Sequence, residues 1–119
     1  MSKRLISVIV PTRDRPDTLR QALASIRALE ADDITFEILV GDNGSDPESR
    51  KVASDFGAIH IPVSDKGAAA ARNAGLKAAT GECLAFLDDD DIWLPSHVRR
   101  HLEILDANPE IEAVLAEHR

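Results

Sequence analysis

The stretch "LISVIVPTRDRPDTLRQALASI" (Leu5–Ile26) contains one complete strand, loop and helix. Its first six residues are mostly β-branched and apolar, which predicts a buried strand that Pro11 ends. Pro16 suits the first position of a helix. The apolar positions that follow it at helical spacing are Leu19, Leu23, Ile26 and Leu29. The stretch therefore predicts a buried strand covered by an amphipathic helix.

The same alternation continues along the chain. Further strands are predicted at 35–40, 58–61, 82–87 and 111–116. Further helices are predicted at 47–55, capped by Asp46 and ended by Gly57, at 67–79, ended by Gly81, and from Pro95 to a stop at 108–109. About five strands and four helices in strict alternation indicate an α/β fold. We expect one domain, residues 1–119, with a doubly wound, mostly parallel, Rossmann-like sheet.

The composition narrows the class of protein. The 119 residues carry a formal net charge of −7, which argues against nonspecific binding to nucleic acid. No apolar run approaches the roughly 20 residues that span a bilayer, and the N-terminal apolar run is too short for a signal peptide. With one cysteine, Cys83, the chain forms no internal disulfide. These features favour a cytoplasmic protein.

In an open parallel sheet, ligands bind beyond the carboxyl ends of the strands. The loops there read "PTRDR", "GDNGSD", "PVSDK" and "DDDD", and each contains a carboxylate. Neither G-x-G-x-x-G nor G-x-x-x-x-G-K-[ST] is present, so the sequence lacks the known glycine-rich phosphate loops. Four adjacent aspartates, Asp88–Asp91, would repel a phosphate unless a divalent cation lay between them. Mg²⁺ or Mn²⁺ binds carboxylate and phosphate oxygens together, which predicts a metal site here.

Four segments in this order resemble the nucleotide-binding half of the inverting family 2 glycosyltransferases, which have the GT-A fold. They are "SVIVPTRDRPDTLRQALASI", "EILVGDNGSDPES", "KGAAAARNAGLKAATGECLAFLDDDDIW" and "LPSHV". The resemblance covers the chain from about Leu5 to Ile104. It implies binding of a nucleoside-diphosphate sugar through Mn²⁺ or Mg²⁺ for inverting transfer to an acceptor.

The resemblance also implies roles for individual residues. Asp42 matches an acid that hydrogen-bonds the base, and Arg72 matches a position beside the base pocket or Asp42. Asp89 matches a position near the ribose. The expected nucleotide-binding residues are Pro11, Thr12, Asp14, Asp42, Arg72, Asn73, Asp88 and Asp89. Asp90, the last acid of the family's D-x-D, is the expected metal ligand, and Asp91 matches an additional acid.

The sequence departs from the family pattern at several places. Gly41 replaces the first acid of the family's "DDGS", Gly44 occupies its serine, and "TRDR" stands where "TYNR" is common. These departures leave the preferred base and sugar open. The acceptor-binding half and the general base of such enzymes are expected beyond Arg119, so the chain itself contains no expected catalytic residue.

Other functions remain open from the sequence. One alternative is a noncatalytic nucleotide-binding or self-associating module, in which an uncovered sheet edge after the fifth strand favours a homodimer. Another is a sugar-phosphate nucleotidyltransferase, although its "GxGTR" signature is absent. The acceptor, a saccharide or a lipid-linked saccharide, is not specified. Many relatives act at the inner face of the membrane, so a peripheral location there is consistent with the resemblance.

We expect the 119-residue chain alone to transfer little or no sugar, because the expected general base lies after Arg119. The assay would follow nucleoside-diphosphate release from sugar donors in the presence of saccharide acceptors. Robust transfer by the purified chain would contradict this expectation.

Overall fold

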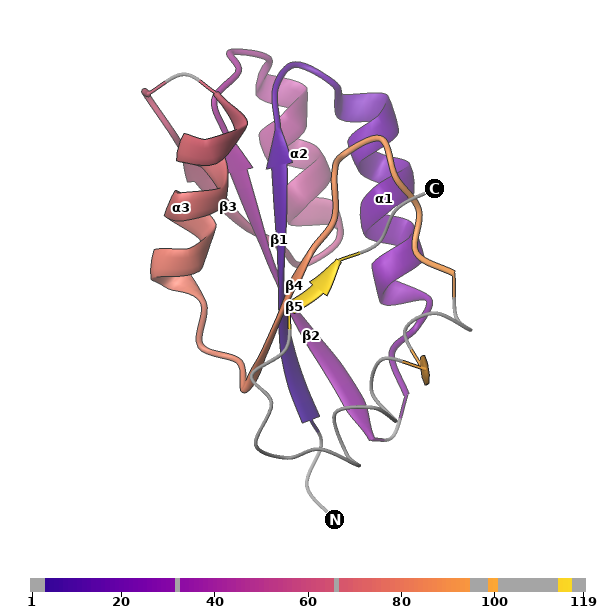
Figure 1. Ribbon diagram of the computed structural model, residues 1–119. Helices are drawn as coiled ribbons and strands as arrows, with labels where there is room; N and C mark the ends of the chain where they lie inside the picture. The colour runs from indigo at the N-terminus through magenta and orange to yellow at the C-terminus, as the bar shows by residue number, and fades with distance from the viewer. Residues whose placement is uncertain (1–3, 32, 66, 95–98, 101–113, 117–119) are drawn as a thin grey trace.

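The computed structural model describes residues 4–31, 33–65, 67–94, 99–100 and 114–116, and its strands and helices alternate from β1 to β4 (Figure 1). The strands are β1 (Arg4–Thr12), β2 (Ile34–Asp42), β3 (Ile59–Pro62), β4 (Cys83–Phe86) and β5 (Val114–Ala116). The helices are α1 (Pro16–Arg27), α2 (Pro47–Asp55) and α3 (Ala68–Ala78). The strands form one sheet in the order β3-β2-β1-β4-β5, and every neighbouring pair is parallel. The predicted α/β class and parallel sheet are confirmed.

Helices cover both faces of this sheet. Successive residues of a strand point to opposite faces. Val8 and Val10 belong to the fully buried core that includes residues of α1 and α2. On the other face, Ile9 packs against Gly75 of α3. The chain therefore places α1 and α2 on one face and α3 on the other, as doubly wound folds do (Figure 1).

Local signals set the helix boundaries where the sequence predicted them. Pro16 and Pro47 occupy the first turns of α1 and α2. The Asp46 side chain accepts a hydrogen bond from the backbone N–H of Glu48 at 3.0 Å, which caps α2. Gly57, after this helix, has a φ of 66°. The predicted fourth helix lies outside the described residues except for 99–100, as does the first half of the predicted fifth strand.

The sequence predicted that Pro11 ends the first strand, and this prediction is wrong. β1 continues through Thr12. The backbone oxygen of Ile9 accepts from Leu87 N after β4, whereas that of Thr12 accepts from Asn43 N after β2. Hydrogen-bonding groups alternate between the two neighbours of a strand, so Pro11 faces the β4 side, as Ile9 does. The last residue pair of β1 with β4 is Ile9–Phe86, so the missing N–H falls where the two strands have separated. Pro11 thus marks the start of an opening between them.

The glycine at position 41 permits close packing of α3 on β2. A Cβ atom on Gly41 would lie 2.3 Å from the backbone oxygen of Ala71 in α3. Backbone cannot yield as a flexible side chain does, so any larger residue would displace the helix. The acid that the resemblance places at this position therefore has no room in this packing arrangement.

We expect Gly41→Ala to lower the free energy of unfolding by about 1–3 kcal/mol, the usual cost of overpacking a closely packed interface. Urea unfolding followed by circular dichroism would measure it. Lys77→Ala, an exposed position on α3, is the matched control and should change stability little. Equal stability of Gly41→Ala and the parent would contradict this packing account.

Candidate functional site

A cleft of about 440 Å³ opens where β1 and β4 separate. It is lined by Pro11, Thr12, Arg13, Arg15, Gly67, Ala68, Arg72, Asp88, Asp89 and Asp90. These residues come from the end of β1 and the loop after it, from the loop after β4, and from the N-cap and first turns of α3. From β1 the chain continues through α1 to β2 on one side, whereas β4 on the other side is reached from β3 through α3 on the opposite face. The gap between β1 and β4 is therefore the switch point of the sheet, where doubly wound folds bind ligands.

A buried hydrogen bond joins the two loops of the cleft. The Thr12 hydroxyl donates to Asp89 Oδ2 at 2.8 Å, and both residues are less than a tenth exposed. Burial has the largest effect on this carboxyl and raises the pKa of Asp89, while the Thr12 hydrogen bond and the positive charge of Arg15 oppose the rise. Asp89 therefore points inward, toward β1.

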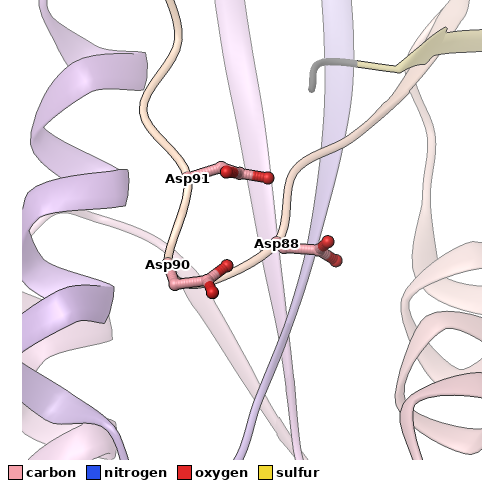
Figure 2. A group of neighbouring side chains, drawn as sticks. All are labelled: Asp88, Asp90 and Asp91. Carbon is pink, nitrogen blue, oxygen red and sulfur yellow. The ribbon is translucent and has the colours of Figure 1, made fainter. Parts of the chain in front are cut away.

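The other three aspartates of the run form a separate group. Ligand oxygens of Asp88, Asp90 and Asp91 all lie within 4.8 Å of one another. Figure 2 shows the three side chains on one loop, with Asp90 and Asp91 pointing toward the side on which Asp88 lies. Oxygens around one Mg²⁺ at about 2.0–2.1 Å are at most about 4.2 Å apart, so small side-chain rotations would bring these carboxylates to one ion. Hard, charged oxygen ligands in this arrangement fit Mg²⁺ or Mn²⁺.

Two arginines face these carboxylates across the cleft. Arg15 Nη1 lies 3.6 Å from Asp89 Oδ1 and 3.7 Å from Asp90 Oδ2. Arg72 Nη2 lies 4.0 Å from Asp88 Oδ1. These separations are long for ion pairs, and both arginine side chains are well exposed. The guanidinium groups are therefore free to turn toward an anionic ligand in the cleft.

The loops after β1 and β2 are held together by Asp14. Its Oδ1 accepts from the backbone N–H groups of Ser45 at 2.7 Å and Asp46 at 2.9 Å. These two bonds lower the pKa of the Asp14 carboxyl. Asp14 has a φ of 53°, a left-handed conformation that Asp tolerates better than most residues. A Cβ on Gly44 would lie 2.5 Å from Asp14 Oδ1, so the glycine makes room for this contact.

The Asp42 carboxylate lies one strand away, at the end of β2. It is 6% exposed and uses both oxygens: Oδ1 accepts from the Gly44 backbone N–H at 2.8 Å, and Oδ2 lies 2.8 Å from Nε2 of His60 in β3. The side chain in contact with Asp42 is thus His60, while Arg72 contacts Asp88. His60 was not among the residues that the sequence predicted for the site.

A tryptophan anchors the acidic loop to the core. Trp93 is 3% exposed and packs against Phe36 with ring centroids 5.8 Å apart. Its backbone N–H donates to Ser25 Oγ of α1 at 3.1 Å. Trp93 therefore packs in the core at the end of the loop that carries the aspartates.

The sequence located most of the cleft. Six of the nine predicted site residues line it: Pro11, Thr12, Arg72, Asp88, Asp89 and Asp90. Asp14, Asp42 and the exposed Asn73 lie outside its lining. The lining residues that were not predicted are Arg13, Arg15, Gly67 and Ala68. Alternating basic residues in "TRDR" at the end of a strand were the available signal for the two arginines.

Such a cleft, with clustered carboxylates and facing arginines in a doubly wound α/β domain, is typical of proteins that bind an anionic ligand together with a divalent cation. The family model for "Glycosyl transferase family 2" matches residues 7–116. The chain belongs to this family of glycosyltransferases.

Individual relatives agree with this assignment. The chain is 32% identical over 112 residues to the Escherichia coli "UDP-Glc:alpha-D-GlcNAc-diphosphoundecaprenol beta-1,3-glucosyltransferase WfgD". The match covers 91% of this chain and 44% of that protein. A second relative, an uncharacterized glycosyltransferase of Nostoc, is 36% identical, with 87% of this chain and 33% of the relative covered. The chain thus spans less than half the length of these relatives.

A solved structure shares the fold as well. Glucosyl-3-phosphoglycerate synthase from Mycobacterium tuberculosis, in complex with Mn²⁺, UDP and glucosyl-3-phosphoglycerate, superposes with a TM-score of 0.66 at 26% identity. The superposition covers 86% of this chain and 39% of that one. The expected GT-A type of nucleotide-binding fold is confirmed.

We expect Asp89→Asn to stabilise the protein at pH 7 when a chelator is present. In the folded protein the pKa of Asp89 lies above its ordinary value of 3.8. The stability that the protonated carboxyl contributes is therefore lost as pH rises from the ordinary pKa through the folded-state pKa. A neutral amide removes the buried charge and can still accept from Thr12. Urea unfolding in EDTA at several pH values would test this.

The advantage of the variant should shrink as pH falls through the range in which the parent carboxyl becomes protonated. Asp55→Asn, which changes an exposed carboxylate on α2 that pairs with Arg20, is the control and should change stability by less than about 1 kcal/mol. A variant less stable than the parent at pH 7 would contradict the burial argument.

Proposed function

We propose that this chain is the donor-binding part of a metal-dependent, inverting glycosyltransferase that uses a nucleoside-diphosphate sugar. The observation that carries the proposal is the group of Asp88, Asp90 and Asp91 carboxylates at the switch-point cleft, beside Arg15 and Arg72. A bound diphosphate needs positive charge to neutralise it. In this cleft the two arginines supply positive charge directly, and the carboxylates can hold a divalent cation that supplies more. The relatives' names and the family assignment support the same class of reaction.

Asp90 is the proposed principal metal ligand, with Asp88 and Asp91 completing the carboxylate group. When bound, Mn²⁺ or Mg²⁺ would neutralise the diphosphate and so assist its departure from the sugar. Manganese is present together with UDP in the mycobacterial relative, which supports this choice of cofactor.

The remaining cleft residues would hold the nucleotide. The guanidinium groups of Arg15 and Arg72 can rotate away from the aspartates and bind phosphate oxygens. Gly67 and Ala68 begin α3, whose N-terminal backbone N–H groups favour an anion, and no side chain caps that end. Pro11 and Thr12 form the wall below the ribose, near Asp89. Asp42, at the end of the adjacent strand, would receive the base, with Asp14 supporting its loop and Asn73 beside Arg72.

The acceptor half and its general base would be supplied by sequence outside residues 1–119. A lipid-linked saccharide is the proposed acceptor, by analogy with the diphosphoundecaprenol substrate in the name of the Escherichia coli relative. Among the described residues, no helix is both long and apolar enough to cross a membrane. We place the protein in the cytoplasm, peripherally at the inner face of the membrane, because such an acceptor would be reached there. Self-association through the sheet edge stays a prediction.

Calorimetric titration with UDP, GDP and TDP, with and without Mn²⁺, tests this function. We expect at least one nucleotide to bind in a Mn²⁺-dependent manner, and Asp90→Ala to weaken that binding tenfold or more, a loss of about 1.4 kcal/mol. The reason is that removing Asp90 leaves the metal without its principal ligand. Asp55→Ala, which removes an exposed carboxylate far from the cleft, should bind as the parent does.

Binding that is independent of metal, or absent, would contradict the proposal and leave the noncatalytic module as the better description. The nucleotidyltransferase alternative is not favoured, because the family match and the curated relatives are glycosyltransferases.

A further inference from the structure

The contact between His60 and Asp42 lies outside the cleft and has no counterpart among the roles assigned above. Nε2 of His60 and Oδ2 of Asp42 are 2.8 Å apart, and the side chains are 17% and 6% exposed. His60 pairs in register with Val40, two residues before Asp42, so the two side chains lie on the same face of the sheet. β3 is the outermost strand on this side.

This contact completes the fixation of the carboxylate plane. Rotation about the Cβ–Cγ bond of an aspartate is soft, so one hydrogen bond leaves the second oxygen free to swing. Here the Gly44 backbone N–H holds Oδ1 and His60 holds Oδ2. Two donors on two different oxygens, one from the following loop and one from the next strand, determine the orientation of the whole group.

We infer that His60 is a positioning residue for nucleobase recognition, acting through the orientation of Asp42. The inference rests on the proposed function and deepens it. Each carboxylate oxygen has two lone pairs, so Asp42 keeps acceptor capacity after these two bonds. A fixed acceptor at the end of β2 suits a base that presents a ring N–H, such as uracil, thymine or guanine. His60 itself need not touch the base.

A purely structural role would predict a different pattern of effects. If His60 only joined β3 to β2, its loss would lower stability and weaken every ligand of the site alike. If it orients Asp42 for the base, its loss weakens nucleotides and spares a ligand that has no base. Pyrophosphate with Mn²⁺ is such a ligand, because it offers the diphosphate and cation but nothing for Asp42.

The experiment compares His60→Gln, His60→Asn and His60→Leu by calorimetry. The titrants are Mn²⁺-pyrophosphate and the Mn²⁺ complex of whichever of UDP, GDP or TDP binds the parent most tightly. The amide nitrogen of Gln reaches the position of His Nε2, whereas that of Asn corresponds to Nδ1 and falls short. We expect Asn and Leu to weaken nucleotide binding about tenfold, the loss typical of a hydrogen bond to a charged group. Gln should stay within about twofold of the parent.

Pyrophosphate affinity should be unchanged in all three variants. Ile59→Thr, an exposed neighbour on the opposite face of β3, is the matched control and should bind both ligands as the parent does. Thermal unfolding identifies any variant that fails to fold. The comparison of His60→Gln with His60→Asn then decides whether the hydrogen bond to Asp42 is what matters, since both replacements are polar and of similar size. In Asp42→Asn, His60→Asn should add no further loss, because the two residues act as a unit.

Equal losses for nucleotide and pyrophosphate, or a Gln variant as weak as Asn, would overturn the role of His60. If the parent binds pyrophosphate and nucleotide with Mn²⁺ equally well, base recognition by this chain is refuted and the inference with it. A parent that binds neither ligand refutes the proposed function itself. The failure of each proposal is therefore distinguishable.

Discussion

The hydrogen bond between the Thr12 hydroxyl and Asp89 is the contact on which the arrangement of the cleft depends. It joins residues 77 positions apart and fixes the loop after β4 against the end of β1. Because Asp89 turns inward, its neighbours Asp88 and Asp90 are left facing outward. The backbone N–H of Asp91 donates to the oxygen of Asp88 at 3.0 Å, which closes the turn and brings the outer carboxylates together. One inward side chain thus organises three outward ones.

This arrangement has an energetic cost that other contacts offset. Burial works against the charge on Asp89, and adjacent carboxylates repel one another where no cation is bound. The loop holds its shape because Trp93, which directly follows it, is packed in the hydrophobic core against Phe36. Strain that is concentrated at a ligand site and compensated by neighbouring packing is common in functional sites.

The parts of the fold that the sequence predicted well rest on local signals. These signals are the buried strand runs, Pro16 and Asp46. Each depends on only a few neighbouring residues, and the structure has the predicted strand or helix start at each of them. Pro11 misled because its effect depends on which neighbour its missing N–H faces, and that follows from the path of β4. In the same way the Asp42–His60 and Arg15–Asp90 contacts depend on strand register and loop geometry. A single sequence does not encode these in any local pattern.

The position of β1 at the centre of the sheet has a further consequence. On one side of it lies β4 with the acidic loop, and on the other lie β2 and β3 with Asp42 and His60. The two groups are connected through β1 and the loop that follows it, and through α3, whose Ala71 packs on Gly41 and whose Arg72 lies near Asp88. The outer strand β3 is separated from β4 and its carboxylates by two strands, β2 and β1. Under the proposed function, base recognition and diphosphate binding are thus assigned to opposite sides of the central strand.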